Sequence, residues 1–196
     1  MSLFRYLWIL VTGRASTAGD VSATFADRQP SLILDNLSLI LPQGVDLRVD
    51  VQYLTEDPPA PYYYGRPPAA ELGKGEDLIR LCKEKGCDCS GLVLSLAVEE
   101  GLCTPEWAEA HRTTSAIMTG CTALGKDWAG VNPGDVAGYS GHVAMVFALA
   151  DDGCPLCISA SGGGESTHGD DPDAHAKIVR ADYRSDFLGF YRFPSE

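Results

Sequence analysis

Residues 87–101, CDCSGLVLSLAVEEG, contain a clear helix signal and the most distinctive cysteine of the chain. Apolar residues recur there at helical spacing, so the sequence predicts a helix over 89–100 that Gly101 ends. We interpret Asp88 as the residue that caps this helix through the first backbone N–H groups. Cys89 then lies in the first turn, where the helix dipole favours a thiolate. This stretch therefore predicts a nucleophilic cysteine at the start of a buried helix.

A histidine opens a long apolar segment further along the chain. Residues 142–150 read HVAMVFALA, which predicts a strand buried on both faces, and the turn PGDV at 133–136 leads into a strand before it. A cysteine at a helix start and a histidine at a strand start are typical of papain-like catalysis. The imidazole takes the thiol proton and later protonates the leaving amine. We therefore predict Cys89 as nucleophile and His142 as general base and acid.

The rest of the second half predicts a mixture of helices and strands. Residues 75–85 have apolar side chains at helical spacing and predict a helix. Residues 157–161 and 188–193 are short strand candidates, and the polar, glycine-rich stretch 162–176 predicts a long loop. Helices that precede several strands are typical of an α+β domain. We therefore expect an α+β domain over 71–196.

The first part of the chain has a different pattern. Residues 46–54 alternate apolar and polar side chains and predict a half-buried strand, with another strand over 37–41. The proline-rich residues 58–70 do not suit a helix and predict an extended linker. We therefore expect a small β-rich unit over 1–57, separated by this linker from the α+β domain.

Composition and charge limit the class of partner. The chain has 45% hydrophobic and 21% charged residues, which is typical of a globular core. Its net charge of −12 argues against DNA or RNA, since phosphate binding needs a basic surface. We expect no membrane span, because no apolar stretch approaches the required length. The apolar run 6–11 is shorter than that of a secretory signal, so the cellular location stays open.

Four segments, taken in order, resemble the NlpC-type cell-wall cysteine peptidases. They are DCSGLV from Asp88, RTTSA from Arg112, PGDV from Pro133 and GHVA from Gly141. The similarity covers about residues 60–196, and the ordered set is more specific than any one motif. It implies a papain-like fold, Cys89 as nucleophile, His142 as base, and hydrolysis of amide bonds in peptidoglycan stem peptides. Because both reacting groups are side chains, it implies no cofactor and no metal.

The same resemblance implies further site residues. Tyr64 lies in an aromatic-glycine segment, YYYG, like the one that precedes the cysteine in this family, although the gap to Asp88 is longer here. Tyr64, Arg112 and Ser90 are predicted to bind substrate, with Arg112 holding a carboxylate. The family's orienting residue for the histidine lies on the following strand and is often a histidine. Ser159 occupies that position here, and its hydroxyl holds an imidazolium less strongly than a carboxylate does.

Several alternatives stay open from the sequence alone. A loop residue could replace Ser159 as the orienting group: Glu165, His168 or His175. If the weak support of His142 abolishes turnover, the chain is a non-catalytic cell-wall-binding module on the same fold. Cys154 and Cys157 have the C-x-x-C spacing of thiol–disulfide exchange, although they lead into a strand rather than a helix. We expect peptidoglycan or a muropeptide as partner, with the N-terminal unit docking a delivery or wall component.

Overall fold

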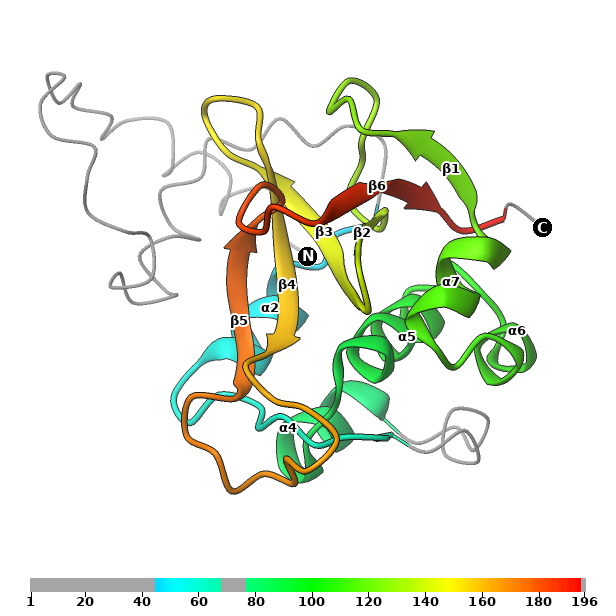
Figure 1. The fold of residues 1–196 in the computed structure, drawn as a ribbon. Helices are drawn as coiled ribbons and strands as arrows, with labels where there is room; N and C mark the ends of the chain where they lie inside the picture. Colours follow the sequence, from blue (N-terminus) through cyan, green and yellow to red (C-terminus); the bar gives the residue numbers. More distant parts are fainter. Residues whose placement is uncertain (1–44, 68–76, 195–196) are drawn as a thin grey trace, which may run out of the picture.

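The computed structural model describes residues 45–67 and 77–194. Its elements, in chain order, are α2 (Arg48–Thr55), α4 (Leu78–Lys85), α5 (Cys89–Glu99), α6 (Pro105–Ala110), α7 (Thr114–Gly120), β1 (Thr122–Gly125), β2 (Val136–Tyr139), β3 (His142–Leu149), β4 (Pro155–Ser161), β5 (His175–Arg180) and β6 (Phe187–Arg192). The strands form one six-stranded sheet in the order β1-β6-β2-β3-β4-β5, and every neighbouring pair is antiparallel. Helices precede the strands in the chain (Figure 1), so the predicted α+β class is confirmed.

The central strand β3 separates two apolar clusters. Val143, Met145 and Phe147 belong to the larger cluster, to which all the described helices contribute. Ala144 and Val146 alternate with them and belong to the smaller cluster, together with residues of β2, β4 and β6. Since successive side chains of a strand point to opposite faces, β3 is buried on both sides, as its continuous apolar sequence predicted.

Helix α5 is the central helix of the larger cluster and packs against β3 and β4. Its residues from Cys89 to Ala97 are all buried, which explains its apolar sequence on every face. The side chain of Asp88 accepts a hydrogen bond from the backbone N–H of Gly91, so the predicted cap is confirmed. The helix ends at Glu99, and Gly101 follows with a φ of 67°, a conformation that favours glycine.

The strand predicted over 46–54 is wrong, because residues Arg48–Thr55 form helix α2. Leu47, Val51 and Leu54 are fully buried, whereas Val49 is 75% exposed. Spacings of four and three residues match a helix, and the period-two alternation was a coincidental second pattern in the same stretch. Helix α2 packs on α4 and β5 within the larger cluster. The other predicted strand of the N-terminal unit, 37–41, lies outside the described residues.

Most other predicted elements are found with shifted ends. Helix α4 begins at Leu78, capped by Asp77, and ends before Gly86 as expected. The loop predicted over 162–176 ends before His175, where β5 begins and pairs with β4. Strand β5 itself was not predicted. The short helices α6 and α7 were not predicted. Each is capped by a threonine side chain, a local signal that was present in the sequence.

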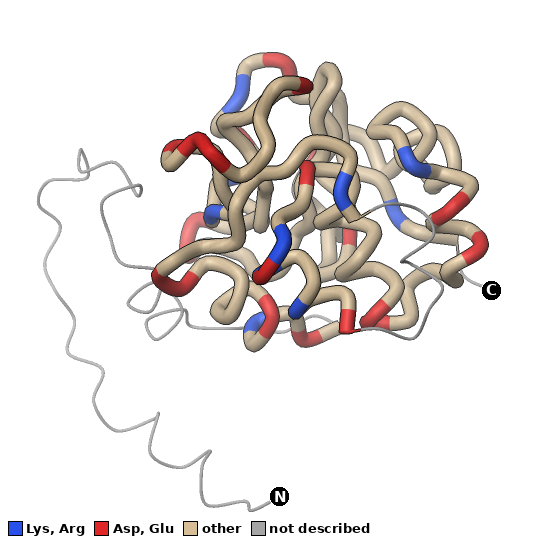
Figure 2. Tube along the Cα trace, turned by 90° about the horizontal axis from the view of Figure 1, so that it is seen from below, with Lys and Arg blue, Asp and Glu red and all other residues tan. Residues whose placement is uncertain are grey.

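Surface charge is mixed, with acidic positions in excess. Figure 2 shows Lys and Arg standing singly among the Asp and Glu positions on the face it views. Within residues 45–67 and 77–194, no helix is long and apolar enough to cross a membrane.

An ion pair between a buried carboxylate and a partly exposed arginine joins the start of β2 to β6. Asp135, the acidic residue of the PGDV turn, is 2% exposed and also accepts a hydrogen bond from the Asn132 backbone N–H. Arg192 donates to both of its carboxylate oxygens, with both distances 2.7 Å. A bidentate pair of this kind fixes geometry as well as charge, so it holds the turn on the sheet.

We expect Arg192→Gln to lower the free energy of unfolding by about 3 kcal/mol, measured by urea denaturation. The substitution leaves the buried Asp135 carboxylate without its cation, which is costly. Arg80→Gln is the matched control, because Arg80 forms an exposed pair with Glu84 and should cost only about 0.5 kcal/mol. Equal losses in the two variants would contradict a structural role for the pair of Asp135 and Arg192.

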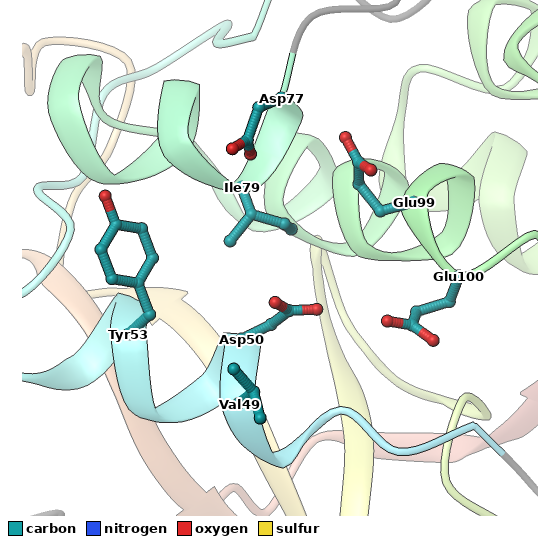
Figure 3. Close-up of a pocket in the computed structure, with 7 residues that line it drawn as sticks. All are labelled: Val49, Asp50, Tyr53, Asp77, Ile79, Glu99 and Glu100. Atoms are coloured by element: carbon teal, nitrogen blue, oxygen red, sulfur yellow. The ribbon is translucent and has the colours of Figure 1, made fainter. Parts of the chain in front are cut away.

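An acidic pocket lies where α2, α4 and α5 meet. Figure 3 shows the carboxylates of Asp50, Asp77, Glu99 and Glu100 around it, with Tyr53 on one wall. Burial raises the pKa of Asp50 and of Glu100, and the nearby negative charges add to both shifts. The hydrogen bond between these two carboxyls lowers the pKa of Asp50 and raises that of Glu100, so Glu100 is the first of the two to take up a proton as the pH falls.

We expect Glu100→Gln to stabilise the protein at pH 7 but not at pH 3. A carboxyl whose pKa is raised by folding is protonated in both states at low pH, and it costs stability once pH exceeds the unfolded value of about 4. The glutamine amide keeps a donor for Asp50 and removes the repulsion. Thermal unfolding from pH 3 to pH 8 measures the effect, with Glu165→Gln in an exposed loop as control. A gain that does not change with pH would contradict this origin.

Candidate active site

Asp88 organises the start of helix α5. Its carboxylate accepts hydrogen bonds from the backbone N–H groups of Gly91 at 2.7 Å and Gly65 at 2.8 Å. The Ser90 hydroxyl donates to the same carboxylate at 2.8 Å. Asp88 is 7% exposed, so these three donors replace the water that the charge has lost. The carboxylate thereby fixes the first turn of the helix, in which Cys89 lies.

Residues 60–67, which we call the strap, cross over this first turn. The carbonyl of Arg66 accepts from the Asp88 N–H, and a side chain on Gly91 would collide with that carbonyl. Gly91 is therefore required for the close approach of the strap, because any side chain there would collide with it. The strap is also held from the other side, because the Tyr62 N–H donates to Ala174 and the Tyr64 N–H donates to Thr167.

Cys89 is 8% exposed, and its surroundings favour the neutral thiol. Burial raises the pKa of this thiol to about 11, and the adjacent Asp88 carboxylate contributes to the rise. Backbone N–H groups of Val143, Ser90 and Cys89 hydrogen-bond to the sulfur and lower its pKa, as expected at a helix start. Because burial and Asp88 outweigh them, the thiol is protonated at neutral pH.

His142 lies at the start of β3, immediately before the residue that touches the Cys89 sulfur. Its ring is 7% exposed, and its Nε2 atom lies 2.8 Å from the Ser159 hydroxyl on β4. Burial lowers the pKa of His142 to about 4; the charge of Arg184 lowers it further and that of Asp186 opposes the shift. The imidazole is therefore neutral at pH 7. In this resting arrangement both groups are therefore neutral, and proton transfer from Cys89 to His142 stays a prediction.

The structure brings Cys89, His142 and Ser159 to one place from α5, β3 and β4. Helix α5 packs on β3, and the backbone N–H of Val143 on that strand lowers the pKa of the Cys89 thiol. In the described part of the chain there is no hydrogen bond between the sulfur and the imidazole itself. Since Nε2 is engaged by Ser159, the ring atom left for the thiol proton is Nδ1. Such contacts commonly tighten only when substrate is bound.

The predicted substrate-binding residues differ in how accessible they are. Tyr64 is 45% exposed and free to contact a ligand with its ring. Ser90 is buried and donates to Asp88. The Arg112 guanidinium donates to the carbonyl of Pro67, while its NH1 atom is buried without a hydrogen-bond partner among the described residues. Ser90 and Arg112 thus support the strap and helix start in this structure.

The strap supplies a residue that the sequence did not single out. Tyr62 is 6% exposed, and its ring packs directly on Gly163 of the β4–β5 loop. Burial raises the pKa of its hydroxyl, and the next contribution comes from Cys89 nearby. Tyr62 lies in the extended part of the strap and Tyr64 in the turn that follows it, so the YYYG pattern alone did not decide which ring is buried.

The loop candidates for orienting His142 have other partners. His168 Nδ1 lies 3.0 Å from the Ser166 carbonyl, and His175 Nδ1 lies 2.9 Å from the Ala176 carbonyl. Glu165 is exposed. Of the predicted candidates, Ser159 is the one that the structure places against the imidazole. Within the described ranges no group of three or more His, Cys, Asp or Glu side chains is arranged to hold a metal ion.

The remaining cysteines are free thiols. Cys154 and Cys157, the pair with C-x-x-C spacing, are buried, and burial raises the pKa of both. A thiol with a raised pKa is a poor nucleophile for disulfide exchange. The pair lies at the start of β4 rather than at a helix N-terminus, and nothing in its surroundings favours a thiolate strongly enough to offset this burial.

Comparison with known proteins adds no assignment: no family model, no curated protein and no solved structure matches the chain significantly. The functional proposal is therefore based on the geometry of the site and on the sequence motifs.

We expect alkylation of Cys89 by iodoacetamide to accelerate about tenfold per pH unit between pH 6 and pH 9, because the thiolate fraction grows by that factor below the pKa. Mass spectrometry of the Cys89 peptide measures the rate. Asp88→Asn should raise the rate at each pH, since it removes the neighbouring charge. A rate that levels off below pH 8 would show that the thiol is already ionised.

Proposed function

We propose that this protein is a cysteine peptidase or amidase that hydrolyses amide bonds with Cys89 as nucleophile and His142 as general base and acid. The observation that carries the proposal is the meeting of α5, β3 and β4. A cysteine in a helix first turn lies close enough to the backbone N–H that follows His142 for that group to lower its pKa, and the histidine is held through Nε2 by a buried hydroxyl. The ordered motif resemblance supports a papain-like arrangement of these elements.

In the proposed reaction the Cys89 sulfur attacks the carbonyl carbon of the scissile amide. Its proton passes to Nδ1 of His142 as the carbon–sulfur bond forms, and the imidazolium then protonates the leaving amine. Water, activated by the neutral His142, hydrolyses the thioester and regenerates the thiol. The backbone N–H of Cys89 at the helix start is a donor for the oxygen of the tetrahedral intermediate.

The neutral resting pair fits this sequence of steps. A neutral imidazole is ready to accept a proton across the neutral pH range, because its pKa of about 4 lies well below it. A thiol with a pKa of about 11 transfers its proton only as it attacks, so proton transfer and bond formation are coupled. A carbonyl bound at the helix start excludes water and strengthens the backbone donors that favour the thiolate.

We propose peptidoglycan stem peptides as the substrate class, on the strength of the motif resemblance. Tyr64, a half-exposed residue of the strap, is the proposed substrate contact. The net charge of −12 provides no attraction to an anionic wall, so we propose that the N-terminal segment docks a wall or delivery component. Residues 1–44 of that segment lie outside the described residues.

Digestion of purified peptidoglycan tests the proposal. We expect the wild type to release muropeptide fragments with newly formed amino termini, identified by mass spectrometry. Cys89→Ala and His142→Gln should release none, because each removes a reacting group, with residual rates at least 10³-fold lower. Cys121→Ser is the matched control, since that partly exposed thiol lies at the C-terminal end of α7 and takes no part in the proposed reaction, so the variant should retain full activity.

The competing function is a cell-wall-binding module that does not turn over. Two observations favour it specifically: the absence of a hydrogen bond between the Cys89 sulfur and the His142 ring in the described structure, and the hydroxyl of Ser159 in place of an ionisable partner. If the wild type and Cys89→Ala bind peptidoglycan equally and neither releases fragments, hydrolysis is excluded and the binding module is the correct assignment.

A further inference from the structure

We infer that Arg66 and Arg112 form a binding site for a free carboxylate of the substrate at the end of the strap; this deepens the proposed function and rests on it for its catalytic meaning. Arg66 belongs to the strap, and the guanidinium of Arg112 donates to the carbonyl of the next strap residue, Pro67. Two cations from segments far apart in the sequence thus come to adjacent residues of the strap.

Neither of these two arginines has an acidic partner within residues 45–67 and 77–194. The other five arginines in those ranges each form an ion pair with an aspartate or a glutamate: Arg48, Arg80, Arg180, Arg184 and Arg192. Acidic residues are in excess, since the net charge of the chain is −12. Two arginines that lack a carboxylate at the same place therefore leave a position for a negative charge that a ligand brings.

Arg112 has donors that the protein does not use. A guanidinium carries five N–H donors, and the described contact, with the Pro67 carbonyl, leaves Nη1 buried without a hydrogen-bond partner in the described part of the chain. A buried charged donor without a partner costs free energy, so a ligand that accepts from Nη1 recovers that cost. Because Nη1 is closed to solvent in the free protein, binding must shift the Arg112 side chain until this donor faces the ligand.

Asp88 does not supply the missing carboxylate. Its charge acts on Arg112, but its two oxygens already accept from the backbone N–H groups of Gly91 and Gly65 and from the Ser90 hydroxyl. Asp88 thus favours the cation from a distance and leaves the guanidinium donors to another anion.

Arg66 is held by contacts that do not neutralise it. Its guanidinium lies over the Tyr63 ring, with the central carbon 4.2 Å from the ring centroid, and its Nη1 atom is 3.4 Å from the Lys85 carbonyl oxygen. A cation–π contact fixes the plane of the guanidinium while its charge stays unpaired. The side chain is therefore oriented for a ligand before the ligand arrives, which lowers the entropic cost of binding.

A peptide carboxylate fits this arrangement. Its two oxygens match the planar fork of a guanidinium, a geometry that a lysine does not offer. The Arg66 carbonyl accepts from the Asp88 N–H, so the strap end lies beside the residue that precedes Cys89. Since an extended peptide rises about 3.3 Å per residue, the bound carboxylate belongs to a residue only a few places from the scissile amide. Peptidoglycan stem peptides, the proposed substrate class, carry free carboxylates near their amide bonds.

Calorimetric titration of the full chain with the substitution Cys89→Ala tests the inference, because this variant cannot cleave the probe by the proposed reaction. The probes are the tripeptide L-Ala-γ-D-Glu-L-Lys and the same tripeptide with both carboxylates converted to carboxamides. We expect the acid form to bind at least tenfold more tightly, the effect of one hydrogen bond between charged groups. Inorganic sulfate and phosphate at the peptide concentration should not compete.

Substitution of each arginine in the same background separates recognition from structural support. We expect Arg66→Gln and Arg112→Gln each to weaken binding of the acid form about tenfold and to leave the amide form unchanged. Arg80→Gln is the matched control and should affect neither peptide, because Arg80 is paired with Glu84 on α4. If Arg112→Gln does not fold, Arg66→Gln decides the question. A merely structural role in holding Pro67 would weaken both peptides equally and would overturn the inference.

The remaining outcomes distinguish the inference from the proposed function. Equal affinity for the two peptides, no binding of either, or displacement of the acid form by sulfate or phosphate each overturns the carboxylate site. If wild-type protein still releases fragments from peptidoglycan in that case, the hydrolase proposal stands without it. If binding depends on the carboxylates and on both arginines while the wild type releases no fragments, the carboxylate site stands and the hydrolase proposal fails.

Discussion

The carboxylate of Asp88 is the constraint on which the candidate site depends. It gathers the helix start, the strap and the Ser90 hydroxyl on one buried charge. The same charge opposes ionisation of the neighbouring Cys89. The residue that builds the site therefore also restrains its nucleophile, because the charge that fixes the geometry raises the pKa of the thiol. Functional sites commonly combine order and unfavourable electrostatics in this way.

The two halves of the site are controlled by different parts of the molecule. The sulfur responds to the helix start and the strap, whereas the imidazole responds to the sheet and to the turn that contains Arg184 and Asp186. The packing of α5 on β3 joins these halves, and it places the Val143 backbone N–H where it favours the Cys89 thiolate.

The sequence predicted those parts of the fold whose signals are local. Helix α5, the cap at Asp88 and the buried strand β3 were all recognised, because apolar spacing and capping leave a strong pattern over few residues. Helix α2 was misread, since its apolar positions fit two periods at once and only burial distinguishes them. Strand β5 was not predicted, because its formation depends on pairing with β4 rather than on its own composition.

The motifs indicated Cys89 and His142 as the candidate pair, but they did not predict the protonation state of either side chain. A helix start predicts a thiolate when the cysteine faces solvent, and the burial of Cys89 under the strap reverses that balance. The strap reaches the site from another part of the chain, so no local pattern could place it. Its role follows from tertiary contacts alone.

The contact between Tyr62 and Gly163 links the strap to the β4–β5 loop. The ring lies where a side chain on Gly163 would have to be, so neither position can change size independently of the other. Any diversification of this wall of the site must therefore occur as a paired exchange, in which bulk gained by the loop is lost by the strap. Related sequences should therefore show correlated changes in side-chain size at positions 62 and 163.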